Sequence, residues 1–264
     1  MRAVVACWLL LGFFQSPSHA AVAVDTRQLQ LEFSPFGDLT TLTACLPSCS
    51  DPGARRQQFT SYRGFLTANR NTNSLFELQR RNGERSIELL FTNLVSGETR
   101  RWRIPHGGYQ LGVELTRPEG LVMAAGQALE RPAGAGFTAW LESIRLLELA
   151  EDGLAQYDPE AGVGPLDAGG DWIGFRNRYW AAMIKPEGQE QARVPAAADV
   201  SDLKWELAGA DATSARYTVY AGPVTHEALS AADRELAVLA WSDLPPGLRW
   251  IGKALHAMLG WMHG

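Results

Sequence analysis

The sequence predicts a mainly β protein, built as a large antiparallel β-sandwich with helices near its C-terminus. Apolar and polar side chains alternate along most of residues 24–150, turn-forming residues separate these segments, and helical periodicity follows near the end of the chain. Strands that succeed one another without intervening helices favour an antiparallel sandwich over a βαβ fold. With 264 residues and 46% hydrophobic content, the chain can bury a sizeable core.

The first strand is predicted in the segment RQLQLEF, where Leu29, Leu31 and Phe33 alternate with polar residues. Such a pattern is typical of a strand with one buried face. Similar reasoning predicts further strands at Ser86–Asn93, Arg100–Ile104, Tyr109–Leu115, Thr138–Leu141, Arg145–Leu149, Trp180–Ile184, Leu203–Leu207 and Arg216–Tyr220.

Turns and loops separate the predicted strands. Asn82-Gly83, Ser96-Gly97 and the segment Pro105–Gly108 carry the residues that favour tight turns. Two longer segments, Asp158–Gly170 and Lys185–Val200, are rich in Gly, Pro, Ala and charged residues. We expect both to be surface loops, because strand-like segments lie on either side of each.

One helix is predicted at Thr225–Trp241, with Thr225 as its N-cap. Pro245-Pro246-Gly247 ends this helical region. The apolar face of the helix comprises Leu229, Ala232, Leu236 and Leu239.

Residues 1–20 have the organisation of a signal peptide. Arg2 forms a short basic region, Ala3–Phe14 is an apolar run, and Ser18-His19-Ala20 has small residues where a signal peptidase cleaves. An apolar run of this length is shorter than a membrane-spanning helix requires. We expect export and cleavage after Ala20, with Ala23 as the second choice; the alternative is a buried helix retained in the mature protein.

Two cysteines remain after the expected cleavage, Cys45 and Cys49. Their spacing does not match the CxxC redox motif, and no further metal ligands are close in the sequence. In an oxidising compartment we expect a disulfide between them, which would stiffen the chain locally. The alternative is two unpaired thiols in a proline-containing loop.

The sequence contains no recognisable catalytic constellation. It has no GxSxG, P-loop or GxGxxG motif, and His226-Glu227 does not extend to HExxH because Ser230 stands at the second ligand position. The net charge of −5 disfavours nucleic acid as a partner. We therefore expect a non-enzymatic protein without metal or cofactor.

The segment GGDWIGFRNRYWAAMIKP resembles a motif of the periplasmic domain of the YidC membrane-protein insertases. In that family a tryptophan is followed seven residues later by a tyrosine, and a proline comes seven residues further on. Trp172, Tyr179 and Pro186 keep this spacing, and Trp180 stands where the family usually has phenylalanine. These large aromatic residues are expected to serve the fold, packed in its core, rather than a binding surface.

Other stretches resemble the same family in the same order. VDTRQLQLEFSPFGDLTTLTA is similar to the first strands, and Gly222-Pro223 to a strand exit into a helix. The terminal WIGKALHAMLGWMH is similar to the amphipathic helix that leads into the insertase core. The resemblance implies a large β-sandwich of the galactose-mutarotase-like supersandwich type, spanning residues 21–241, with an interfacial helix at 242–264.

The expected C-terminal helix has a broad apolar face. Residues expected at a membrane interface are Leu248, Trp250, Ile251, Lys253, Leu255, Met258, Leu259, Trp261 and Met262. Its length and its basic residues disfavour a membrane-spanning helix. The alternative is a helix packed on its own sandwich.

The resemblance implies a location in the periplasm, peripherally associated with the inner membrane. It also implies an accessory or binding role in membrane-protein insertion or translocation, with the SecDF components of the Sec translocon or an insertase as partners. We expect the chain to stop before the insertase core and its buried arginine, so insertase activity is not implied. The alternatives are a carbohydrate-binding or mutarotase-like protein on the same superfold, and a truncated or split insertase.

Overall fold

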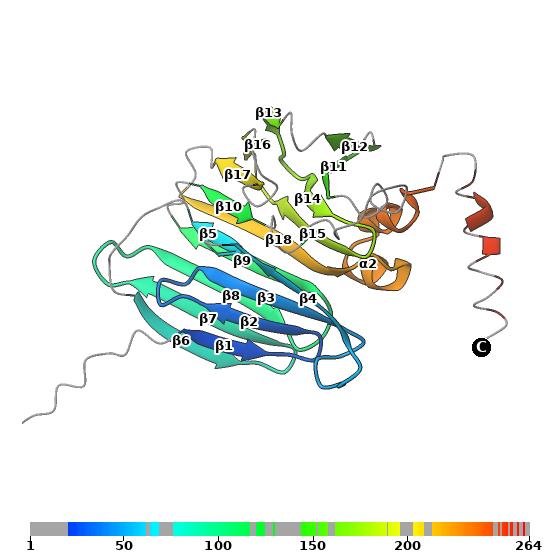
Figure 1. Cartoon of the computed structure of the whole chain (residues 1–264). Helices are drawn as coiled ribbons and strands as arrows, with labels where there is room; N and C mark the ends of the chain where they lie inside the picture. The colour runs from blue at the N-terminus through cyan, green and yellow to red at the C-terminus, as the bar shows by residue number, and fades with distance from the viewer. Residues whose placement is uncertain are drawn as a thin grey trace, which may run out of the picture.

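Two antiparallel sheets of nine strands each form a β-sandwich in the computed structural model of the chain (Figure 1). The predicted fold class is confirmed. Helices follow the last strand, as expected from the sequence. The structure describes residues 21–61, 64–68, 76–116, 120–124, 129, 144–151, 153–157, 162–188, 190–195, 203–208, 213–244, 248, 250–252, 254–255, 258 and 261.

The first sheet contains the N-terminal strands and three strands from the second half of the chain. Its strand order is β1-β2-β3-β5-β10-β17-β16-β13, and β4 also pairs with β3. These strands are β1 (Val22–Asp25), β2 (Leu29–Phe33), β3 (Leu39–Leu46), β4 (Arg55–Thr60), β5 (Leu66–Ala68), β10 (Leu121–Ala124), β13 (Val163–Asp167), β16 (Gln191–Val194) and β17 (Lys204–Ala208).

The second sheet contains the longer strands and the motif segment. Its order is β12-β11-β14-β15-β18-β9-β8-β7-β6. These strands are β6 (Phe76–Asn82), β7 (Ser86–Asn93), β8 (Thr99–Pro105), β9 (Gln110–Thr116), β11 (Arg145–Ala150), β12 (Gly153–Tyr157), β14 (Trp172–Arg176), β15 (Trp180–Pro186) and β18 (Ser214–Pro223).

Side-chain alternation places the core between the sheets, as predicted. In β2, Leu29, Leu31 and Phe33 are buried, whereas Gln30 and Glu32 are more exposed. The strand predicted at Ser86–Asn93 coincides with β7. The predicted strand at Thr138–Leu141 lies outside the described residues, and the other predicted strands overlap observed ones.

Two tryptophans join the sheets through hydrogen bonds. The indole nitrogen of Trp102 in the second sheet donates to the carbonyl of Gly37, at 2.9 Å, in the β2–β3 turn. The indole nitrogen of Trp205 in the first sheet donates to the carbonyl of Gly174, at 3.0 Å, in β14. A buried indole N–H group needs a hydrogen-bond partner. Each tryptophan therefore buries apolar area and also forms a directional hydrogen bond between the two sheets.

The two segments predicted as loops each contain a short strand. β13 lies within Asp158–Gly170 and β16 within Lys185–Val200, and the two strands pair with each other at the edge of the first sheet. The register shifts between Val163 and Leu166, next to Pro165. An edge position and a bulge tolerate proline and glycine, which explains why the composition of the β13 segment resembles that of a loop.

The single helix predicted at Thr225–Trp241 is divided into two. Helix α2 (His226–Ala232) ends at Asp233, whose backbone is extended, and a 3-10 helix, η3 (Glu235–Trp241), follows. Thr225 is the N-cap of α2, as predicted, and its hydroxyl accepts a 3.3 Å hydrogen bond from the N–H of Ala228. The predicted apolar face is buried at Leu229, Leu236 and Leu239 and half-buried at Ala232.

Candidate functional site

The motif segment forms the adjacent strands β14 and β15 in the second sheet. Trp172 and Trp180 are buried, as expected, and Pro186 is also buried and pairs with Tyr217 in β18. Tyr179 is 49% exposed, so the expectation that all three aromatic residues pack in the core is wrong for this one. The side-chain oxygen of Asn177 accepts hydrogen bonds from the backbone N–H groups of Tyr179 and Trp180, which form a tight turn with Tyr179 at its surface.

The buried motif residues hold the C-terminal helical region against the second sheet. The guanidinium of Arg176 donates to the carbonyl of Leu239 at 2.7 Å, to the hydroxyl of Ser242 and to the carboxylate of Asp243. The other oxygen of Asp243 accepts from Arg145 at 2.7 Å. Burial lowers the pKa of Arg176, and the negative charge of Asp243 opposes this effect.

Gly222 and Pro223 end strand β18 beside the motif, where they pair with Ala181 and Trp180. A Cβ atom on Gly222 would lie 2.6 Å from the ring of Tyr109, so only glycine permits this close approach. The hydroxyl of Tyr109 in turn donates a 2.8 Å hydrogen bond to the carbonyl of Cys45 in the opposite sheet. The Gly-Pro segment therefore lies next to the contact between the two sheets.

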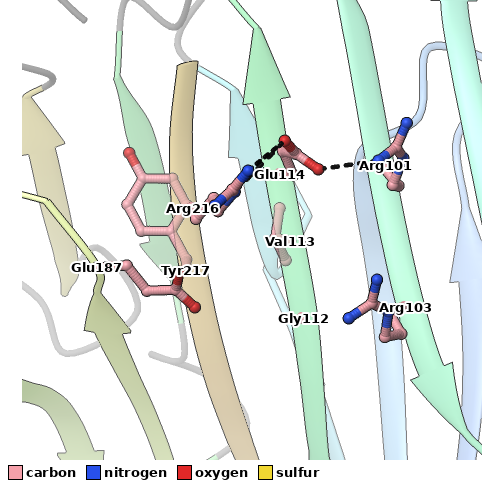
Figure 2. A pocket seen from close by; sticks show the side chains of 8 residues that line it. All are labelled: Arg101, Arg103, Gly112, Val113, Glu114, Glu187, Arg216 and Tyr217. Carbon is pink, nitrogen blue, oxygen red and sulfur yellow. Dashed lines mark hydrogen bonds and ion pairs between the residues drawn. The ribbon is translucent and has the colours of Figure 1, made fainter.

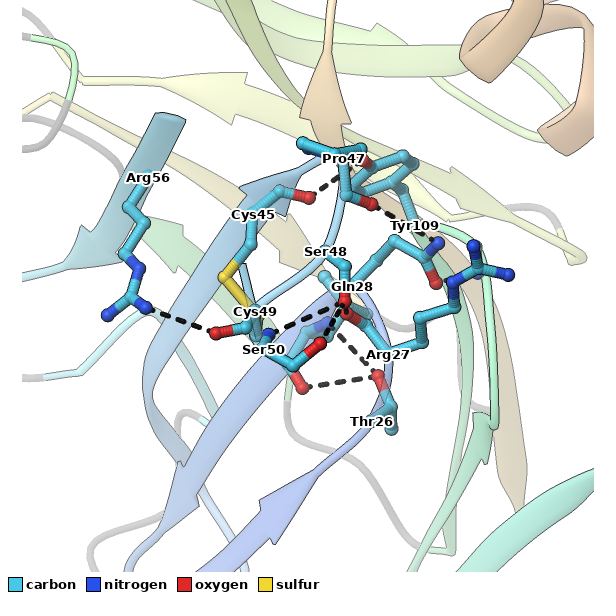
Figure 3. Close-up of a disulfide and its surroundings, with 12 residues drawn as sticks. Thr26, Arg27, Gln28, Cys45, Pro47, Ser48, Cys49, Ser50, Arg56 and Tyr109 are labelled. Atoms are coloured by element: carbon cyan, nitrogen blue, oxygen red, sulfur yellow. Dashed lines mark hydrogen bonds between the residues drawn. A yellow bond between two sulfur atoms is a disulfide. The ribbon is translucent and has the colours of Figure 1, made fainter. Parts of the chain in front are cut away.

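The predicted disulfide between Cys45 and Cys49 is present (Figure 3). The backbone N–H of Cys45 donates to the carbonyl of Gln28, and that of Cys49 donates to the carbonyl of Arg27. The guanidinium of Arg56 donates to the carbonyl of Cys49 at 3.1 Å. The disulfide loop thus fastens the start of β2 to the end of β3.

These separately predicted features meet at one end of the sandwich. A pocket of about 540 Å³ opens between the disulfide loop, the β14–β15 turn and the start of α2. The guanidinium of Arg178 lies 5.7 Å from the centre of the Tyr179 ring, and Arg55 is also exposed at this pocket. The lining residues are Leu46, Arg55, Arg178, Tyr179, Trp180, Pro223, Val224 and Thr225.

The C-terminal segment begins at the same end of the sandwich (Figure 1). Residues 250–252, 254–255, 258 and 261 are helical. A Cβ atom on Gly252 would lie 2.7 Å from Leu244 and 3.4 Å from Trp241, so Gly252 lies close to the last residue of η3 and to Leu244. Exposed apolar side chains are Leu248 (50%), Trp250 (67%), Ile251 (37%), Leu255 (51%), Met258 (50%) and Trp261 (84%).

Three of the predicted interface residues, Lys253, Leu259 and Met262, lie outside the described residues. Within the described part of the chain, no helix is both long and apolar enough to cross a bilayer. The same residues include no group of three or more His, Cys, Asp or Glu side chains arranged to hold a metal ion.

A second hollow, of about 370 Å³, lies on the outer face of the second sheet. Cross-strand pairing places Glu114 of β9 between Arg101 of β8 and Arg216 of β18. Figure 2 shows the guanidinium groups of Arg101 and Arg216 on either side of Glu114, and Arg103 beside Gly112 further along the strands. The sequence predicts strands at Arg100–Ile104, Tyr109–Leu115 and Arg216–Tyr220, but the register that brings these residues together could not be predicted.

The sequence reasoning also missed the residues that anchor the helical region, Arg145, Arg176, Ser242 and Asp243. The available signal was an arginine at the end of the apolar segment WIGFR, because a charged residue in a buried strand needs a partner. The partner Asp243 could not be identified, because it is 67 residues further along the chain.

No family model matches the chain, and comparison with curated proteins gives no match either. A relationship with the YidC periplasmic domain therefore stays a proposal that rests on the sequence motifs.

Proposed function

We propose that this protein is a non-enzymatic accessory module that docks on a membrane surface through its C-terminal amphipathic helix. The observation that carries the proposal is the set of exposed apolar side chains in that helix, among them Trp250 and Trp261. Large apolar side chains left exposed together mark interaction surfaces. Tryptophan has an amphipathic side chain and is enriched at the headgroup level of bilayers. This favours a lipid surface over a soluble protein as the partner of the helix.

The magnitude of apolar burial is sufficient for reversible binding. Full burial of a large apolar side chain contributes about 1.5–3 kcal/mol. Leu248, Trp250, Leu255, Met258 and Trp261 are each at least half exposed, so each can bury more area in a bilayer. Even after the entropy of ordering is subtracted, several such side chains support a peripheral interaction.

Basic residues at the same end of the sandwich support an orientation with this end towards anionic lipid. Arg55 and Arg178 are exposed at the end pocket, and Tyr179 lies beside them. A basic residue close to an anionic membrane surface contributes about 1 kcal/mol. Binding is then expected to weaken at high salt, because exposed charges are screened within a Debye length.

The resemblance to the YidC periplasmic domain suggests which membrane this is. We place the protein in the periplasm at the inner membrane, exported by its signal peptide. Its role there is that of a binding module in membrane-protein insertion or translocation, with SecDF or an insertase as partner. This part of the proposal is an analogy with a family, and it follows the motifs around Trp172 and Gly222.

The test is liposome flotation of the mature protein and of a variant truncated after Leu244. This truncation keeps Asp243 and its ion pairs, so the sandwich is expected to stay folded. The full protein should float with vesicles that contain phosphatidylglycerol, less so at high salt, and the truncated protein should not.

A matched control separates the helix from general surface hydrophobicity. Leu94 and Val95 are 63% and 83% exposed in the β7–β8 turn. Changing both to Ser should leave flotation unchanged, whereas Trp250→Ser with Leu255→Ser should reduce it strongly. The proposal is wrong if the truncated protein floats as well as the full one, or if truncation unfolds the sandwich.

A further inference from the structure

We propose that the hollow on the outer face of the second sheet binds an oxyanion, a carboxylate or phosphate group carried by a multiply charged ligand. This site is separate from the C-terminal helix, and the inference does not rest on the proposed membrane function. It is built by the strands β8, β9 and β18, from Arg101, Arg103, Glu114 and Arg216 around Gly112.

The ion pairs of the three arginines at the hollow are long, at 3.2 Å or more. Glu114 is shared between two arginines, with distances of 3.2 Å to a terminal nitrogen of Arg101 and 3.4 Å to one of Arg216. The ion pair of Arg103 is the longest of the three, at 3.5 Å from its Nε to a carboxylate oxygen of Glu88. Each guanidinium has five N–H donors, and most of these donors remain available to a ligand.

Exposure makes these groups accessible. The side chains of Arg101, Arg103 and Arg216 are 49%, 67% and 62% exposed. Glu114 and Glu187 line the hollow, and Glu88 contacts Arg103 from the neighbouring strand.

Gly112 provides the space that the ligand needs. It pairs with Arg103 on one side and with Thr218 on the other, so a side chain at this position would stand in the middle of the hollow. A Cβ atom on Gly112 would have its nearest heavy-atom neighbour 3.7 Å away, which is ordinary contact and demands no glycine for packing. The missing side chain leaves a floor between the guanidinium groups of Arg103 and Arg216 (Figure 2).

The geometry favours a ligand with more than one negative charge. Arg101 and Arg216 are separated by the strand that carries Glu114, which puts them two strand spacings apart, roughly 10 Å at their backbones. Arginine forks bind carboxylate and phosphate oxygens through paired hydrogen bonds. A ligand such as citrate or pyrophosphate can contact two or three forks together, whereas acetate can contact only one.

The proposal is tested by isothermal titration calorimetry of the full mature chain with citrate, pyrophosphate and acetate at low salt. Citrate and pyrophosphate should bind saturably, and acetate more weakly. Arg103→Gln and Arg216→Gln should each lower affinity by about tenfold or more, because each removes charged hydrogen bonds. Gly112→Leu should abolish binding by filling the hollow, and Glu114→Gln should strengthen it by releasing two arginines.

Matched controls come from the first sheet. Arg193 is 61% exposed and pairs across strands with Glu206, and Gly164 has no heavy atom within 4 Å of a Cβ. Arg193→Gln and Gly164→Leu should leave binding unchanged, and thermal unfolding should show that every variant is folded. The inference is overturned if neither the wild type nor Glu114→Gln binds citrate or pyrophosphate saturably, or if Arg193→Gln weakens binding as much as Arg103→Gln.

The source of the oxyanion is separated by a second arm with phosphatidylglycerol vesicles. If Gly112→Leu and Arg103→Gln reduce vesicle binding of the full chain as well as citrate binding, a lipid phosphate is a ligand of the hollow. If they reduce only citrate and pyrophosphate binding, the ligand is a soluble anion. Both results support the site.

Discussion

The indole nitrogen of Trp172 donates a 3.1 Å hydrogen bond to the carboxylate of Asp233, 61 residues further along the chain. Asp233 is the C-cap of α2, and its other oxygen accepts a 3.0 Å hydrogen bond from the N–H of Glu235, at the start of η3. The ammonium of Lys185 lies 5.9 Å from the centre of the Trp172 ring and 2.6 Å from a carboxylate oxygen of Glu235. The aromatic motif and the C-terminal helices are thus one structural unit.

This relationship predicts that Trp172 serves stability. Trp172→Ala should lower the free energy of unfolding by about 3–5 kcal/mol, because it removes a fully buried ring. Trp172→Phe keeps much of the ring but removes the hydrogen bond, and should cost less. Tyr179→Ala changes an exposed aromatic residue of the same motif and should stay within about 0.5 kcal/mol.

Denaturant unfolding followed by circular dichroism measures all three variants. If Trp172→Ala retained wild-type stability but lost affinity for a partner, the motif would be a binding surface instead.

The ion pairs of Asp243 lead to a second prediction, on the residues that fasten the helical region. Asp243→Asn leaves the guanidinium of Arg176, whose side chain is only 1% exposed, without its counter-charge. Breaking a buried ion pair by changing one partner costs about 3–5 kcal/mol. Hydrogen exchange should show the loss first in η3, whose Leu239 carbonyl accepts from the same arginine. Asp167→Asn, in edge strand β13, is the control.

If η3 had the same protection from hydrogen exchange in Asp243→Asn as in Asp167→Asn, the ion pairs of Asp243 would not be what holds the helical region in place.

Much of the sandwich was predictable because its longer strands bury one face. In β7, Ile87, Leu89 and Phe91 are buried and alternate with more exposed residues, and the predicted bounds match the observed strand. The short strand β13 was not predicted, because it lies at a sheet edge and none of its side chains is fully buried. Its neighbour β16 was not predicted either, because a strand of only four residues gives little alternation to detect. Edge pairing depends on backbone contacts that a single sequence does not display.

The rest of the candidate sites could not be predicted, because they depend on tertiary contacts. The interruption of the predicted helix at Asp233 follows from hydrogen bonds that include the distant Trp172. Similarly, Arg101, Glu114 and Arg216 become neighbours only through the register of three strands. Only Cys45 and Cys49, five residues of chain from first to last, were close enough for their contact to be inferred directly.

The disulfide is expected to be complete in protein purified without reductant, so thiol labelling should detect neither cysteine. Closure of so short a loop contributes about 2 kcal/mol or less by the chain-entropy relation. Changing both cysteines to Ala should therefore lower stability modestly and leave the fold intact. Quantitative labelling of both residues in the native protein would contradict this.

Glu190 predicts a pH dependence of stability. Glu190 is only 3% exposed, and burial raises the pKa of its carboxyl group above the ordinary value. Hydrogen bonds from the backbone N–H groups of Glu190 and Gly188 lower this pKa, whereas the negative charge of Glu187 raises it further. A raised folded-state pKa favours the protonated form on folding. The stabilising contribution is therefore present below the unfolded pKa and is lost as pH rises through the folded pKa.

Glu190→Gln, which stays neutral, should thus gain stability relative to wild type as pH rises from about 4 towards 8. Thermal unfolding across this range measures the difference, and Glu84→Gln, an exposed turn residue, is the control. A difference that is constant with pH would show that ionisation of Glu190 is not its cause.

The last prediction concerns the two cleavage positions expected from the sequence, after Ala20 and after Ala23. Strand β1 begins at Val22, which pairs with Phe33, and Ala23 pairs with Glu32. Cleavage after Ala23 would remove half of this four-residue strand and place a charged amino group on Val24, which is only 1% exposed. Burying an unpaired charge is costly, so the folded protein favours a start at Ala21. Mass spectrometry of the exported protein should find that start, and a recombinant chain that begins at Val24 should unfold at a lower temperature than one that begins at Ala21. A native start at Val24, or a mature chain that retains Met1–Phe14, would refute the prediction, the latter in favour of an anchored or retained helix.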